Sequence, residues 1–385
     1  MIQENNIEAF LALLRGGLWD LSNVNYDFNL NFNGVDWEKV FQLSEKQSVT
    51  GLIAEGIDHI KKQVPSFWIP QEWALQFIGN ALQLEQHNAA MNSFIATLIG
   101  KMRDVGIYAL LLKGQGVAQC YERPLWRANG DMDFFLSDDN YQKAKEYLQP
   151  LVSSIEPEGV YEKHLGMTIN EWVVELHGTL HVGLSARVDR MLDNVQYAIF
   201  HRGEVRSWMN GQTQVFLPAA NEDVVYVFVH ILQHFYKGGI GLRQICDWCR
   251  LLYTYKDSLN YGLLEQRIKR AGLMSEWKAF YNLASRYLGM PDYGEGLMVH
   301  DSRFDKKADR IMEFILKSGN MGHNRGSWLM EHDSWLTRQY VVRKAFSMFR
   351  RIGDLINHAR IFPLDSLRFF PRIMFNGLRS AVRGE

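Results

Sequence analysis

The stretch of sequence that decides the fold is residues 107–136, IYALLLKGQGVAQCYERPLWRANGDMDFFL. It begins with a continuous apolar run at 107–112, bounded by Gly106 and Gly114, which is typical of a strand covered on both faces. It ends with a second predicted strand at 131–136. Because glycines and a proline lie between the two runs, we expect only a short helix and a loop there.

Helices are expected on both sides of this stretch. Residues 36–104 carry apolar side chains at helical spacing, with Asp36 as the predicted N-cap and Gly106 as the stop. Much later in the chain, residues 222–235 and 243–253 show the same spacing and predict two further helices.

More strands are expected between these helical parts. Asp138 or Asp139 is placed to cap a helix that follows the second strand. After it, strands at 167–169 and 172–176 predict a hairpin that turns at 170–171. This alternation of strands and helices is typical of an α/β or α+β core.

The whole chain is therefore assigned to the α+β class. We expect a small mixed-sheet core at 101–217, flanked by an N-terminal helical region at 1–100 and a C-terminal helical region at 218–385. A length of 385 residues leaves room for two or three domains, and 47% apolar residues can bury a large core.

Charge and targeting signals narrow the class of protein. The formal net charge of -1 gives no general electrostatic reason to expect nucleic acid or an anionic membrane as a partner. We find no signal peptide and no apolar run of about 18 residues, so a transmembrane segment is not expected. With three cysteines, of which Cys246 and Cys249 share one face of a predicted helix as packing residues, a cytoplasmic location is expected.

The residues that can carry chemistry are three carboxylates. Asp131 and Asp133 stand at i and i+2 on a predicted strand, so both side chains face the same way. Two neighbouring carboxylates repel each other, and a bound Mg²⁺ relieves that repulsion with hard oxygen ligands. Glu175, on a later strand, would have to reach the same metal site.

A possible phosphate-binding segment lies upstream, at the end of the first strand. Gly114, Gln115 and Gly116 open a helix, where backbone N–H groups can approach an anion closely. Lys113 adds a point charge for phosphate, and Arg127 can add a bidentate one.

At these residues the chain resembles a known group of enzymes. The ordered set LLLKGQG at 110–116, RANGDMDFFL at 127–136 and VVELHGTLH at 173–181 is similar to the DNA polymerase beta-like nucleotidyltransferase superfamily. More narrowly, it resembles an uncharacterised bacterial nucleotidyltransferase family, over about residues 36–255.

The resemblance implies an activity and its cofactors. Asp131 and Asp133 would ligate Mg²⁺ or Mn²⁺, and Glu175 would be a third ligand or the general base. An NTP, expected to be ATP, would give its nucleoside monophosphate to an acceptor hydroxyl or phosphate, a reaction of the EC 2.7.7 type. Gly114 would match the loop glycine, but many superfamily members have serine at the next position, where this chain has Gln115.

Several interpretations of single residues stay open. Lys113 can instead be a solvated lysine, and Arg127 can form an ion pair with one of the two aspartates. His177 can contact substrate, or it can make a hydrogen bond in the core. Arg243 and Asp247, at i and i+4 on a helix, can form an ion pair or line the acceptor cleft.

Alternative functions are also open. The fold could serve a phosphotransferase acting on a small molecule, or a non-catalytic nucleotide-binding interaction module. Action on nucleic acid is disfavoured by the near-neutral charge. Residues 338–385 hold ten Lys or Arg against three acids among aromatic side chains, which permits peripheral membrane contact, although a core role for those aromatics is favoured.

Overall fold

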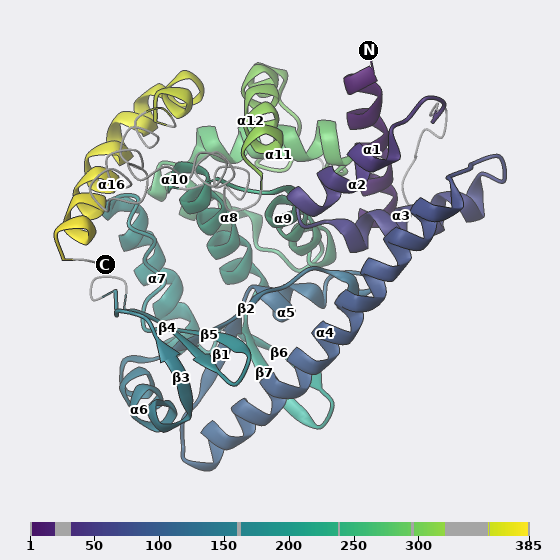
Figure 1. Ribbon diagram of the computed structural model, residues 1–385. Coiled ribbons are helices and arrows are strands. Elements are labelled where there is room, and N and C mark those ends of the chain that lie inside the picture. The colour runs from purple at the N-terminus through teal and green to yellow at the C-terminus, as the bar shows by residue number, and fades with distance from the viewer. Residues whose placement is uncertain are drawn as a thin grey trace, which may run out of the picture.

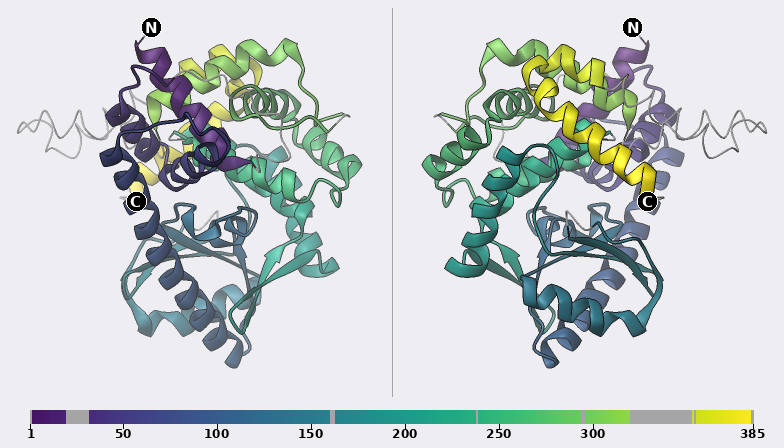
Figure 2. Two further views of the ribbon diagram at one scale, coloured as in Figure 1. Left: turned by 90° about the vertical axis from the view of Figure 1, so that its right-hand side faces the viewer. Right: turned by 90° about the vertical axis from the view of Figure 1, so that its left-hand side faces the viewer.

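A sheet and a set of helices divide the molecule into two halves (Figure 1). The computed structural model describes residues 2–19, 32–159, 163–237, 239–293, 296–319, 353 and 355–383. The two side views in Figure 2 show the sheet in the lower half and most of the helices above it. This mixture confirms the predicted α+β class.

Within the described ranges, the sheet has seven strands in the order β3-β4-β5-β2-β1-β7-β6. Its strands pair in parallel at β2/β5 and β1/β7 and antiparallel elsewhere, so the sheet is mixed, as predicted. The strands are β1 Ala109–Leu112, β2 Asp131–Leu136, β3 Val152–Ile155, β4 His164–Ile169, β5 Trp172–His177, β6 Val205–Asn210 and β7 Thr213–Pro218.

Helices precede, interrupt and follow the strands. No helix in the described part of the chain is long and apolar enough to cross a membrane. The α-helices are α1 Ile2–Leu18, α2 Trp37–Lys46, α3 Thr50–Gln63, α4 Gln71–Asp104, α5 Gly114–Ala118, α6 Asp138–Leu148, α7 Ala186–Arg202, α8 Ala220–Lys237, α9 Leu242–Thr254, α10 Tyr261–Ala271, α11 Met274–Leu288, α12 Asp305–Ser318 and α16 Pro363–Arg383.

The predicted helix ends are confirmed with one exception. The side chain of Asp36 caps α2 by accepting a hydrogen bond from the Lys39 N–H, and Gly106 follows α4 with φ +76°. The predicted cap of α6 was wrong, because Ser137 is the N-cap residue. Asp138 stands one place later, in the first helical turn, where its negative charge interacts favourably with the positive end of the helix dipole.

The other strands were predicted less completely. The predicted hairpin is confirmed as β4 and β5, with φ +55° at Asn170 in the turn, but β4 begins at His164, earlier than predicted. The edge strands β3 and β6 were not predicted, because both are largely exposed and lack a clear apolar face. The neighbouring β7 and the helix α7 were also missed.

Two apolar clusters cover the two faces of the sheet. The second half of α4 and the helix α6 pack against one face through side chains such as Met91, Ile95 and Leu148. The opposite face adjoins the larger cluster, which holds α7, α8, α9 and the N-terminal helices. The predicted site residues Asp131, Asp133 and Glu175 lie on this second face. In the basic segment 338–385, residues 338–352, 354, 384 and 385 lie outside the described part of the chain.

Candidate active site

Strand register brings the three predicted carboxylates together. In the parallel pairing of β2 with β5, Asp133 stands opposite Glu175, and Asp131 shares the face of Asp133. One ligand atom from each of the three lies within 4.8 Å of the others. The alternate residues Met132 and Phe134 are buried in the core on the other face, which anchors the strand.

These carboxylates are crowded enough to shift each other's ionisation. Repulsion from Asp133, together with burial, raises the pKa of Asp131 above its usual range. For Glu175, burial opposes ionisation, but hydrogen bonds from His164 and His177 lower its pKa overall. The site therefore offers carboxylate oxygens whose negative charge is only partly neutralised. Such oxygens are the ligands that a divalent cation such as Mg²⁺ or Mn²⁺ requires.

Lys113 enters the same site from the end of β1. Its Nζ lies 3.0 Å from Asp133 Oδ1, and the carboxylates raise its pKa although burial acts in the opposite sense. The backbone of Lys113 has φ +49°, a conformation that costs energy for a residue with a side chain. The chain therefore holds a strained backbone at the position that aims this ammonium into the site.

Only the first residue of the glycine-rich segment 114–116 lines the cavity. Gly114, with φ +43°, lines the cavity beside Lys113, and a Cβ there would lie 3.2 Å from the Asn129 side chain. The side chain of Gln115 is 1% exposed and donates to Asn88 Oδ1 at 2.7 Å, away from the cavity. Gly116 packs against β7, where a Cβ would meet Leu217 at 2.7 Å. Neither Gln115 nor Gly116 is among the lining residues, and their predicted contact with nucleotide stays a prediction.

Arg127 is held by a partner that the sequence did not suggest. It is 3% exposed and forms a two-pronged ion pair with Asp247 of α9, with N–O distances of 2.9 and 2.6 Å. Pairing of Arg127 with Asp131 or Asp133 was therefore the wrong structural alternative. The same arginine also donates to Asn129, whose amide donates to the backbone oxygen of Asp131, so the pair supports the loop before β2.

Of the two alternatives for Arg243 and Asp247, the ion pair between them was wrong. Asp247 faces Arg127, and its neighbour Arg243 donates to the backbone oxygen of Ala128 at 3.1 Å. Arg243 lines the cavity, which agrees with the alternative that placed it in a cleft. Burial and the nearby Arg127 lower its pKa.

The helix α8 supplies the wall opposite the sheet. His230 Nε2 lies 3.0 Å from Lys113 Nζ and 3.3 Å from His234 Nε2. Burial, reinforced by the Lys113 charge, lowers the pKa of His230 and brings that of His234 to about 4. Both imidazoles are therefore neutral at pH 7. Their i, i+4 spacing on an apolar helix was the available sequence signal for this wall.

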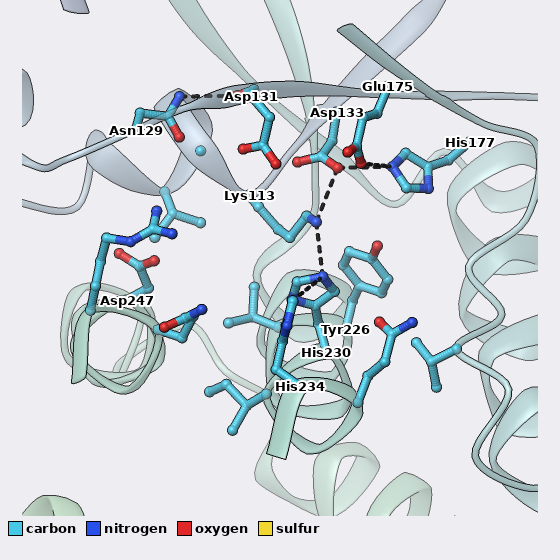
Figure 3. A pocket seen from close by; sticks show the side chains of 18 of the residues that line it. Lys113, Asn129, Asp131, Asp133, Glu175, His177, Tyr226, His230, His234 and Asp247 are labelled. Atoms are coloured by element: carbon cyan, nitrogen blue, oxygen red, sulfur yellow. Dashed lines mark hydrogen bonds and ion pairs between the residues drawn. The ribbon is translucent and has the colours of Figure 1, made fainter. Parts of the chain in front are cut away.

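Together the two walls enclose a cavity of about 330 Å³ (Figure 3). In Figure 3, Asp131, Asp133 and Glu175 lie along the sheet side, Tyr226, His230 and His234 lie along the helix side, and Lys113 reaches between them. His177 completes the sheet side by bonding Asp133 Oδ1 at 2.8 Å. From sequence, His177 was expected either to contact substrate or to make a hydrogen bond in the core; it makes a hydrogen bond, but in the cavity wall, and its contact with substrate stays a prediction. His164 and Tyr226 were missed.

The comparisons with known proteins agree with this geometry. A family model described as an uncharacterised nucleotidyltransferase matches residues 33–289. The chain belongs to this family. The family name gives the general reaction, nucleotidyl transfer, and the matched range contains every residue of the cavity. No curated protein and no solved structure matches the chain.

Proposed function

We propose that the protein is a metal-dependent nucleotidyltransferase that moves a nucleoside monophosphate from an NTP to an acceptor hydroxyl or phosphate. The observation that carries this proposal is the convergence of Asp131, Asp133 and Glu175 within 4.8 Å, beside Lys113, in a cavity. A DNA polymerase beta-like ancestry is part of the same proposal and rests on the ordered motifs. ATP is the nucleotide that we expect.

The residues have separate tasks in this reaction. The three carboxylates would hold Mg²⁺ or Mn²⁺, which neutralises the triphosphate and activates the attacking oxygen when bound. Lys113 would place its ammonium against a phosphate oxygen, and the N–H groups after Gly114 would approach another. Glu175 would either complete the metal site or take the proton of the attacking hydroxyl as it adds to the α-phosphorus and pyrophosphate leaves.

The acceptor would enter between the sheet and the helices α8 and α9. This arrangement fits a catalytic core at 101–217 flanked by helical regions at 1–100 and 218–385. Arg243 lies on the helix side of the cavity and can contact an anionic group of the acceptor or the nucleotide. Binding between two structural layers is common for small ligands. We propose a cytoplasmic location and no nucleic-acid partner.

The test combines binding with product analysis. Thermal stability is measured with ATP, GTP, CTP or UTP, each with and without Mg²⁺, for wild type and Asp131→Asn. A ligand at about 100 times its dissociation constant stabilises the fold by roughly 2.7 kcal/mol. We expect a Mg²⁺-dependent shift in wild type that the variant loses, and release of pyrophosphate when an acceptor is supplied.

Other outcomes would replace the proposal. Release of a nucleoside diphosphate in place of pyrophosphate would indicate a phosphotransferase. A nucleotide-dependent shift that is the same with and without Mg²⁺, and unchanged in Asp131→Asn, would favour a non-catalytic nucleotide-binding module. Absence of a shift with all four nucleotides would remove the support for NTP as the donor.

A further inference from the structure

A second group of metal-binding side chains lies beside the three carboxylates. His164 of β4 stands opposite His177 of β5 in the antiparallel ladder, and Glu175 lies two residues before His177 on the same face. One ligand atom from each of His164, Glu175 and His177 lies within 4.8 Å of the others. The group shares Glu175 with the carboxylate set and adds two imidazoles to it.

The spacing of these atoms is close to that of ligands around one metal ion. His164 Nε2 lies 3.0 Å from Glu175 Oε2, and His177 Nε2 lies 3.5 Å from the same oxygen. A metal with bonds of about 2.1 Å, at angles between octahedral and tetrahedral, needs neighbouring ligand atoms about 3.0 to 3.4 Å apart. The same ring nitrogens face the shared oxygen, so one ion could contact all three.

The surroundings allow the histidines to act as ligands. His177 Nε2 also contacts Asp133 Oδ1 at 2.8 Å, and that oxygen keeps Lys113 at 3.0 Å as a second partner. Asp133 would therefore remain compensated if His177 turned its lone pair to a metal. The His164 side chain is 32% exposed, which leaves a path for an ion and for water or a substrate atom as a further ligand.

We propose that His164, Glu175 and His177 form a binding site for a first-row transition-metal ion such as Zn²⁺. Imidazole nitrogen favours these ions over Mg²⁺, whereas Asp131 and Asp133 offer oxygen alone. The two neighbouring positions thus differ in the metal that they select. The inference goes beyond the proposed transfer reaction, because that reaction needs only the carboxylate position.

The test uses Co²⁺ as a spectroscopic probe on chelator-treated full-length protein, followed by competition with Zn²⁺ and with Mg²⁺. The position and intensity of the visible ligand-field bands depend on the donor atoms and the coordination number, and equilibrium titration gives the affinity. We expect one tight Co²⁺ site that Zn²⁺ competes for and that a large excess of Mg²⁺ leaves occupied, because Mg²⁺ displaces Co²⁺ only from the carboxylate position. His164→Gln should weaken binding at least tenfold and shift the bands.

Matched variants separate this inference from the proposed function. Asp131→Asn should keep the Co²⁺ site, because Asp131 is outside the donor set, although it should lose Mg²⁺-dependent nucleotide binding. His181→Gln, which changes another histidine that lines the cavity, should bind Co²⁺ as wild type does. Circular dichroism of each variant establishes that it is folded.

Two results would overturn the inference. One is an unchanged Co²⁺ affinity and spectrum in folded His164→Gln. The other is the absence of Co²⁺ binding to wild type, which would leave His164 and His177 as hydrogen-bonding partners of the carboxylates. If instead the Co²⁺ site is present while Asp131→Asn binds Mg²⁺ and nucleotide like wild type, the inference stands and the proposed function fails.

Discussion

The sheet wall and the helix wall of the cavity are built in different ways. On the sheet wall, Asp133 and Glu175 are neighbours in the β2/β5 ladder, so backbone pairing alone places them side by side. On the helix wall, His230 and Asp247 come from separate helices, and they meet the sheet only through tertiary packing. The chemistry of one wall can be read from strand patterns, whereas that of the other depends on how distant elements pack.

The two walls also differ in charge. Like charges gather on the sheet wall, and their repulsion raises the pKa of Asp131. Burial keeps the imidazoles of the helix wall neutral, with the pKa of His234 lowered to about 4. Lys113 joins the walls, since its ammonium contacts both Asp133 and His230 at 3.0 Å. We therefore expect substitutions on the sheet wall to change mainly the reaction, and substitutions on the helix wall to change mainly the stability of the fold.

The largest expected effect is on the sheet wall. Asp131→Asn should lower the rate of nucleotidyl transfer at least 10²- to 10³-fold, because it removes a charge that positions the transition state. The same change removes one of two repelling carboxylates, so the melting temperature in chelator should equal or exceed that of wild type.

A matched control on the same wall is Val173→Thr. Val173 is an exposed residue of β5 on the face of Glu175, but it does not line the cavity. Its replacement should leave the transfer rate unchanged and the free energy of unfolding within about 0.5 kcal/mol of wild type. If Asp131→Asn kept more than a tenth of the activity, the assignment of reactivity to the sheet wall would be wrong.

The next prediction concerns the helix wall, where we expect a loss of stability rather than of activity. Asp247→Asn leaves the buried guanidinium of Arg127 without its counter-charge, which should destabilise the fold by about 3 kcal/mol in urea denaturation. Adding Arg127→Met should recover part of this loss, because no unpaired charge remains. Equal stability of the single and double variants would show that the ion pair does not support the wall.

The smallest effect is a pH dependence. The folded pKa of His234, about 4, lies below its unfolded value near 6.5, and Lys113, Lys237 and Arg243 oppose its protonation. The unfolded state therefore binds more protons between these values, so stability is fully present above pH 6.5 and falls as the pH drops toward 4. Between pH 7.5 and 5, wild type should lose up to about 2 kcal/mol more than His234→Gln.

Urea denaturation of both proteins at the two pH values measures this difference. Comparing each protein with itself at pH 7.5 removes the cost of the substitution at neutral pH. The same loss in both proteins would mean that folding does not lower the pKa of His234, and the description of a helix wall that stays neutral down to pH 5 would not hold.

The sequence was most informative where the structure is local. The i, i+2 spacing of Asp131 and Asp133 on a strand determined that they share a face, since side chains alternate along a strand. The run before Gly114 determined a strand covered on both sides. Backbone geometry and the apolar pattern act within a few residues, and so the sequence alone predicted β1, β2 and the β4/β5 hairpin, whereas the inner strand β7 and the helix α7 were missed.

Only the tertiary structure decided which distant residues meet. The partner of Arg127 is Asp247, 120 residues away, and the obvious neighbour Arg243 is used elsewhere. The burial of Gln115 against Asn88 and the contact of Lys113 with His230 likewise depend on how α4 and α8 pack. Such pairings follow from the competition of many buried groups for partners, and this competition is settled only when the whole chain is packed.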